Sequence, residues 1–127
     1  MNNVTDETKP SVSLRPQDLT GNVNGIGVDT AGFRSLAAHL ETGAVSGSSP
    51  TLDVKLQDSA DNSSFADVAG ATFTQVITDD DSQELALENL NTEIRRFVRL
   101  VATVGGSSPS FITSGVIVLG RATNQPA

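Results

Sequence analysis

The sequence predicts an all-β protein, an antiparallel β-sandwich with an extended N-terminal arm. Short segments alternate apolar and polar residues, which is typical of strands with one buried face. Gly-, Ser- and Pro-rich turns separate these segments at intervals of about 8–12 residues, the spacing of a sandwich or barrel. The 127 residues suffice for one domain with a sizeable core, which must be built from Val, Leu, Ile, Ala and the five Phe because the chain has no Trp and no Tyr.

The chain divides into an arm, residues 1–20, and a sandwich domain, residues 21–127. The arm is polar, and Pro10 and Pro16 discourage regular structure in it. Val12 and Leu14 alternate with polar residues, so a short strand could begin there. Such a segment buries little apolar surface by itself, and we expect contacts with other chains, or packing within the monomer, to order it.

Alternation predicts two strands in the first half of the domain. Residues 35–41 place Leu36, Ala38 and Leu40 on one side, and the Gly/Ser-rich stretch 43–50 ends this strand. Residues 52–57 form the next strand, with one dry and one wet face. The acidic stretch 58–64 is read as the turn that joins this strand to the next one, with Leu52, Val54, Leu56, Phe65 and Val68 as core.

Further strands are predicted around Phe73 and Ile77 and around Leu85 and Leu87, on either side of an acidic break at residues 79–81. The apolar spacing over residues 84–96 also fits a helix.

The β-branched run 97–104 is expected to be a central strand, and a Gly/Ser/Pro turn at 105–109 leads to the last strand. The residues expected to be buried in the sandwich are Val54, Leu56, Val98, Leu100 and Val116.

Charge and composition exclude several classes of function. The net charge of −7 argues against nucleic-acid binding, which needs clustered Lys and Arg. The first residues lack the apolar core of a secretory signal, and no stretch approaches the roughly 20 apolar residues of a membrane helix. We expect no membrane association and no secretion.

No residue pattern predicts catalysis or a cofactor. His39 is the sole histidine and has no Cys partner, so it is read as a surface or interface residue. GNVNGIG, residues 21–27, lacks both the dinucleotide spacing and a Walker lysine, and its glycines are read as allowing tight backbone turns. Residues 79–81 with Glu84, and Asp58 with Asp61, offer oxygens to calcium but do not fit the EF-hand pattern. We predict no enzyme, no cofactor and no metal.

One basic cluster, Arg95, Arg96 and Arg99, allows two interpretations. The first interpretation is that they form ion pairs within the monomer, because the chain has fifteen acidic residues. The second interpretation is that they contact a partner chain, since arginine is well suited to ion pairs at interfaces. The predicted partner interface comprises Val12, Leu14, Arg15, His39, Arg95 and Arg99.

Four stretches resemble a family of small virion proteins of tailed bacteriophages: NGIGVDTAGFRSLAAHLETG, LDVKLQDSADNSSFADV, RRFVRLVATVGGSSPSF and GVIVLG. The second and third are also similar to discoidin-like jelly-roll modules. The resemblance implies a jelly-roll-like sandwich in which Phe65 and Phe97 pack inward.

The resemblance also implies a function, a capsid decoration or cement protein on the outer surface of the virion, made in the host cytoplasm. Its expected partners are the major capsid protein and further copies of itself, as a dimer or trimer. The alternatives are a head–tail connector or tail component, and a soluble module that binds carbohydrate or calcium.

Overall fold

The computed structural model describes residues 9–87 and 94–120, and these residues form only strands and loops. The strands are all antiparallel, and no helix of the described residues is long and apolar enough to cross a membrane. They are β1 (Lys9–Leu19), β2 (Val23–Asn24), β3 (Val28–Asp29), β4 (Ser35–Ser59), β5 (Ala66–Thr72), β6 (Asp81–Leu87) and β7 (Phe97–Gly120).

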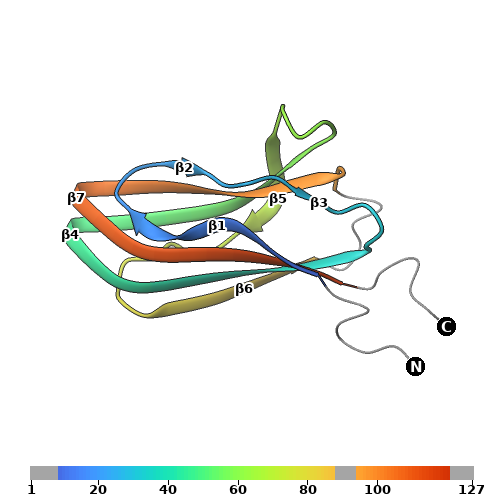
Figure 1. Ribbon diagram of the computed structural model, residues 1–127. Helices are drawn as coiled ribbons and strands as arrows, with labels where there is room; N and C mark the ends of the chain where they lie inside the picture. Colours follow the sequence, from blue (N-terminus) through green and yellow to red (C-terminus); the bar gives the residue numbers. More distant parts are fainter. Residues whose placement is uncertain (1–8, 88–93, 121–127) are drawn as a thin grey trace, which may run out of the picture.

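Two long strands, β4 and β7, are the framework of the fold (Figure 1). They pair along their whole length, from Ser35 opposite Gly120 to Ser59 opposite Phe97. Both bend halfway, where Gly47 and Gly106 have positive φ angles of 112° and 106°. The paired ribbon is therefore folded over on itself, and its two halves lie in two facing layers.

Each layer is completed by shorter strands at its edges. In one layer, β1 pairs with the second half of β7, which pairs with the first half of β4, which pairs with β6. In the other, β2 and β3 pair with the first half of β7, which pairs with the second half of β4, which pairs with β5. We call these the β1–β6 sheet and the β2–β5 sheet. A folded antiparallel ribbon flanked in this way is a jelly roll, so the predicted all-β sandwich is confirmed.

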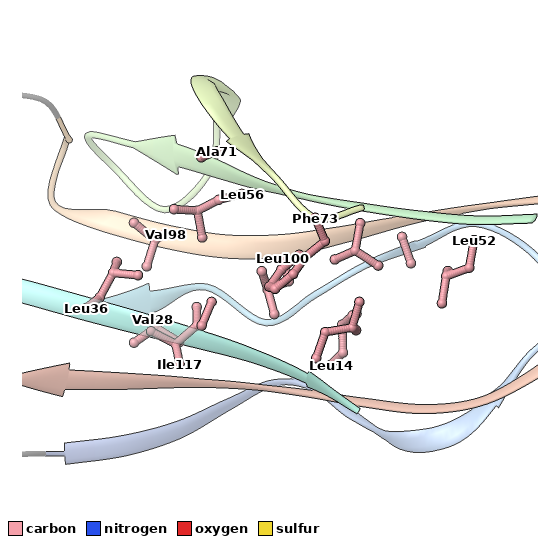
Figure 2. Packing of buried hydrophobic residues seen from close by; sticks show 14 of the residues in the cluster. Leu14, Val28, Leu36, Leu52, Leu56, Ala71, Phe73, Val98, Leu100 and Ile117 are labelled. Atoms are coloured by element: carbon pink, nitrogen blue, oxygen red, sulfur yellow. The ribbon is translucent and has the colours of Figure 1, made fainter. Parts of the chain in front are cut away.

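The core lies between the two sheets (Figure 2). Strict alternation determines its members, because residues two apart on a strand point to the same side. The fully buried large side chains come from both sheets: Leu14, Leu19, Leu40, Leu52, Val54, Leu56, Val76, Val98, Leu100, Phe111, Ile117 and Leu119. Of the residues expected to be buried, Val54, Leu56, Val98 and Leu100 are confirmed.

Val116, Phe65 and Phe97 were expected to be buried in the sandwich, and this prediction is wrong. Val116 is half-buried and lies on the outer side of its strand, while Ile117 points inward. Phe65 and Phe97 are half-buried and lie outside the core. Their rings are covered instead by guanidinium groups: that of Arg99 lies 4.0 Å from the Phe65 centroid, and that of Arg96 5.1 Å from the Phe97 centroid. Phe rings can remain partly exposed there because the cations pack on their faces.

Most of the expected arm is strand β1. Its residues pair with β7 from Lys9 opposite Leu119 to Leu19 opposite Phe111, and Leu14 and Leu19 are buried in the core. This part of the chain is ordered by packing within the monomer. Residues 1–8 lie outside the described residues, as do 88–93 of the segment that also fitted a helix; residues 84–87 of that segment belong to β6.

Ser13 links the two sheets along the β1 edge. It sits at a bulge in β1, between Val12 and Leu14, and is buried. Its hydroxyl donates to the Ile26 carbonyl at 2.9 Å and accepts from the Leu100 N–H at 2.9 Å. The bulge therefore turns a polar side chain inward to satisfy backbone groups of the facing layer.

Candidate interaction surface

Two of the acidic residues singled out in the sequence, Asp61 and Asp79, bind backbone N–H groups. Asp61 accepts hydrogen bonds from the N–H groups of Ser63 and Ser64, at 2.9 and 3.0 Å, and from the Ser59 hydroxyl. These bonds lower the pKa of Asp61 to about 2. Asp79 accepts from the Val45 N–H at 2.8 Å. Within residues 9–87 and 94–120, no group of three His, Asp or Glu side chains is arranged to hold a metal ion.

The glycines of GNVNGIG allow close backbone approach. The Gly25 N–H donates to the Leu100 carbonyl at 2.7 Å, and a Cβ at Gly25 would lie 2.4 Å from that oxygen. A Cβ at Gly27 would collide with the Asn62 side chain. Neither has a positive φ, so both glycines are explained by packing of the β2–β3 segment against its neighbours rather than by a turn.

The three arginines of the basic cluster are all paired within the monomer. Arg95 makes two hydrogen bonds to the Asp58 carboxylate and one to its carbonyl, at 2.8 to 3.1 Å. Arg99 donates twice to the Gln57 side-chain oxygen while its guanidinium lies over the Phe65 ring. Arg95 therefore makes the ion pair expected within the monomer, whereas the partner of Arg99 is the neutral side chain of Gln57.

Arg96 forms the third of these pairs. Its guanidinium donates to both carboxylate oxygens of Asp29, at 2.9 and 2.8 Å. Together with the Ala31 N–H, it lowers the pKa of Asp29 to about 2. This bidentate geometry joins the start of β7 to the end of β3.

The outer face of the β1–β6 sheet is different in character. One row across its four strands is entirely apolar: Pro10 lies opposite Val118, Val118 opposite Ala37, and Ala37 opposite Ala86. In the next row, Val12 lies opposite Val116 on one side, and His39 lies opposite Val116 on the other. We call Pro10, Val12, Ala37, Ala86, Val116 and Val118 the apolar patch; Val12 is 41% exposed.

Charges on this face are unevenly distributed. On the β4 and β6 side, His39 lies 3.3 Å from the Glu84 carboxylate, and Glu41 accepts from the Ser82 hydroxyl at 2.6 Å. On the β1 side, Arg15 is exposed, and its guanidinium makes no ion pair or hydrogen bond with another described residue. The face therefore carries Arg15 at the β1 edge, with the carboxylate of Asp18 further along the same strand opposite Ile112; it is apolar in the middle and carries carboxylates towards β6.

A depression lies on this face beside the apolar patch. Its walls combine two carboxylates with apolar groups and backbone, and the lining residues are Pro16, Glu41, Thr42, Gly43, Asp80, Ile112, Thr113 and Ser114. Ile112 is 48% exposed. Both β1 and β4 shift register next to Thr113, so the strands flanking β7 bulge here and leave the hollow.

The structure brings three of the six predicted interface residues to one face. Val12, Arg15 and His39 lie on the outer side of the β1–β6 sheet, whereas Leu14 is 1% exposed and belongs to the core. Arg95 and Arg99 lie elsewhere, beside Asp58 and Gln57 at the end of the β2–β5 sheet.

Sequence reasoning missed most of the apolar patch. A signal was present in Val116 to Leu119, four consecutive apolar residues in a strand, which indicate that both faces of that strand carry apolar side chains. Asp80 belongs to the acidic stretch 79–81, but nothing in the sequence indicates that it shares a depression with Glu41. The pairing of β4 with β7 and the hydrogen bond from the Asp80 N–H to the Gly43 carbonyl bring the two together.

Several known structures are similar to this one at low sequence identity. A chain of the infectious bursal disease virus VP2 subviral particle matches 94% of this chain with a TM-score of 0.64 and 15% identity, over 34% of its own length. A chain of the infectious bursal disease virus Gx strain matches 94% with a TM-score of 0.60 and 12% identity, over 33% of its length. The SPBc2 prophage-derived protein YomS matches 92% with a TM-score of 0.46 and 14% identity, over 99% of its length.

The chain spans about a third of the length of the viral chains that it matches. No family model and no curated protein sequence matches it. At these identities the similarity concerns the fold alone: the chain has the jelly-roll fold of a segment of the viral chains that build these particles.

Proposed function

We propose that this chain is a structural virion protein without catalytic activity, a decoration or cement protein of a bacteriophage head. It binds the outer surface of the capsid and stabilises it by bridging subunits of the major capsid protein. The observation that supports this most directly is the match of nearly the whole chain, at TM-scores of 0.60 and 0.64, to chains of an assembled virus particle.

The surface chemistry supports an assembly role over a ligand-binding one. The apolar patch spans all four strands of the β1–β6 sheet, as expected of a surface that packs against protein. Of the carboxylates that could offer oxygens to calcium, Asp58, Asp61 and Asp79 already accept hydrogen bonds from arginine and backbone donors. The chain has no Trp or Tyr on which a sugar ring could stack.

A cement protein stabilises a particle by linkage. Because it binds the assembled lattice in preference to dissociated subunits, each occupied site shifts the balance towards assembly. The stabilisation grows with the logarithm of the free protein concentration divided by its Kd, about 2.7 kcal/mol per site at a hundredfold excess over Kd.

Particles that lack this chain provide the test. They are purified, mixed with the full chain, separated from unbound protein by sedimentation, and heated or osmotically shocked. We expect the chain to sediment with the particles at many copies per head and to raise the temperature at which the genome is released. Absence of binding, or binding with unchanged thermal and osmotic tolerance, would contradict a cement role.

The same sample separates the alternatives within the virion. Electron microscopy of reconstituted particles should place the chain over the whole head surface; density confined to one vertex or to the tail would indicate a connector or tail component. Addition of EDTA to the isolated chain should leave its Tm unchanged. A large drop in Tm would support the calcium-binding alternative instead.

A further inference from the structure

We propose that the outer face of the β1–β6 sheet binds a second copy of this chain, related by a two-fold axis that runs parallel to the strands over β7. This inference deepens the proposed function, since it assigns the self-association expected of a capsid-bound protein to one surface. It rests on the charge pattern of that face and on the acidic depression.

Two copies of this face can place one pair of opposite charges in contact, Arg15 on β1 and Glu41 on β4. In this sheet β7 lies between β1 and β4, which are its neighbours on either side. Rotation about an axis over β7 therefore places β1 of each copy on β4 of the other. Arg15 of one face then meets Glu41 of its partner, and the apolar centres meet each other.

The depression gives Arg15 a place to bind. Glu41 and Asp80 provide carboxylates, and Pro16 and Ile112 provide apolar walls, a combination that suits the aliphatic stem and charged head of an arginine. Arg15 has no side-chain partner among the described residues of its own chain, and the rotation carries it towards Glu41 of the second copy. Two symmetric Arg15–Glu41 contacts follow, one at each side of the axis.

The apolar patch forms the centre of the same interface. Val116 and Val118 of β7 lie next to the axis and pack against the same residues of the second copy. Val12 covers His39 of the second copy, and Pro10 covers Ala37, because these pairs are equally distant from β7 on either side. An apolar centre with ion pairs at its border is the usual composition of a stable interface.

A capsid subunit as the occupant of this face fits less well. The depression would then need a cation from the capsid surface at one specific position, whereas the second copy provides one through its own Arg15. Capsid contacts remain available to the opposite sheet and to the bends of β4 and β7, which the dimer leaves exposed.

Charge-swap variants of the full chain test the proposal by sedimentation velocity over a range of concentrations. The wild type should be a dimer. Arg15→Glu and Glu41→Arg should each weaken the dimer Kd by at least about 100-fold, because each sets like charges in contact. The double variant Arg15→Glu/Glu41→Arg should dimerise with itself but not with the wild type. Asp53→Arg, on the outer face of the other sheet, is the matched control and should remain dimeric.

Val116→Glu provides a second, independent test at the centre of the face, and circular dichroism confirms that each variant is folded. A wild type that remains monomeric at high concentration, a trimer, or a dimer that is unaffected by Arg15→Glu and Val116→Glu would overturn the proposal. Capsid binding is measured separately by co-sedimentation, so a wild type that binds particles but stays monomeric, or whose dimer the variants do not weaken, contradicts this interface and leaves the decoration role intact.

Discussion

Gly47 and Gly106 occupy equivalent positions in the two bends of the β4–β7 ribbon, and each packs against the backbone of the other bend. Both begin a Gly-Ser-Ser-Pro tetrapeptide, residues 47–50 and 106–109. A Cβ at Gly47 would lie 2.7 Å from the Ser108 carbonyl oxygen, and one at Gly106 would lie 2.7 Å from that of Ser49. The two bends are thus related by a local two-fold axis, and the repeated tetrapeptide folds the ribbon into two layers.

Alanine at either glycine should destabilise the protein. The positive φ angle disfavours any side chain, and the neighbouring carbonyl must move to admit a Cβ. We expect Gly47→Ala and Gly106→Ala each to lower the free energy of unfolding by about 1–3 kcal/mol. Urea denaturation followed by circular dichroism measures this, since the chain has no Trp or Tyr for fluorescence. Gly21→Ala is the control, because a Cβ there meets no atom within 4 Å.

Loss of the Ser13 hydroxyl should weaken the contact between the two layers. Ser13→Ala leaves the buried Leu100 N–H without its acceptor and the Ile26 carbonyl without one donor. We expect the free energy of unfolding to fall by about 1–3 kcal/mol, the cost of an unsatisfied buried group. Ser63→Ala, whose exposed hydroxyl has no such role, should stay within about 0.5 kcal/mol of the wild type. Equal stabilities of the two variants would contradict this account of Ser13.

Thr42 and Thr113 lie opposite each other, both are buried, and neither hydroxyl has a hydrogen-bond partner among the described residues. Replacing both with Val removes two desolvated hydroxyls at nearly constant shape. We expect Thr42→Val/Thr113→Val to raise the free energy of unfolding, by about 1 kcal/mol or more. Thr30→Val should do the opposite, because the Thr30 hydroxyl donates to the Arg96 carbonyl at 2.6 Å. Calorimetry should show shifts in Tm of opposite sign.

Leu100 and Val116 should respond differently to truncation. Leu100 is fully buried between the layers, and Leu100→Ala should cost about 2–5 kcal/mol. Val116 is half-buried on the outer face, so Val116→Ala should cost well under the Leu100 value when measured on monomer at low concentration. Comparable losses in chemical denaturation would place Val116 in the core after all.

The lowered pKa of Asp61 makes the stability of the protein depend on pH. Its pKa is lowered from 3.8 to about 2 in the folded chain, so its charged form is stabilised by folding. This contribution is present above about pH 4 and is lost as the pH falls towards 2. Asp61→Asn keeps the acceptor oxygen but not the charge. We expect its Tm to lie below that of the wild type at pH 7 and to converge with it near pH 2; a constant difference would contradict this.

The sequence alone predicted several of the strands, and the inward side of those with strict alternation. Leu52, Val54 and Leu56 are separated by polar residues, so only one face of that strand can join a core, and the structure buries all three. The same holds for Val98 and Leu100. The all-β class followed from these local patterns together with the turns between them.

Tertiary structure decided what local pattern leaves ambiguous. In residues 116–119 both faces are apolar, so alternation gives no inward side; pairing with β4 sets Ile117 opposite Ala38 and turns Val116 outward. Residues 9–19 look like a free arm by themselves, and become a core strand because β7 supplies the hydrogen bonds and the surface for Leu14. Phe65 stays out of the core because Arg99, more than thirty residues away in sequence, covers its ring. Each of these outcomes depends on contacts between segments that are distant in the sequence. The free energy of such contacts cannot be inferred from a short stretch of sequence.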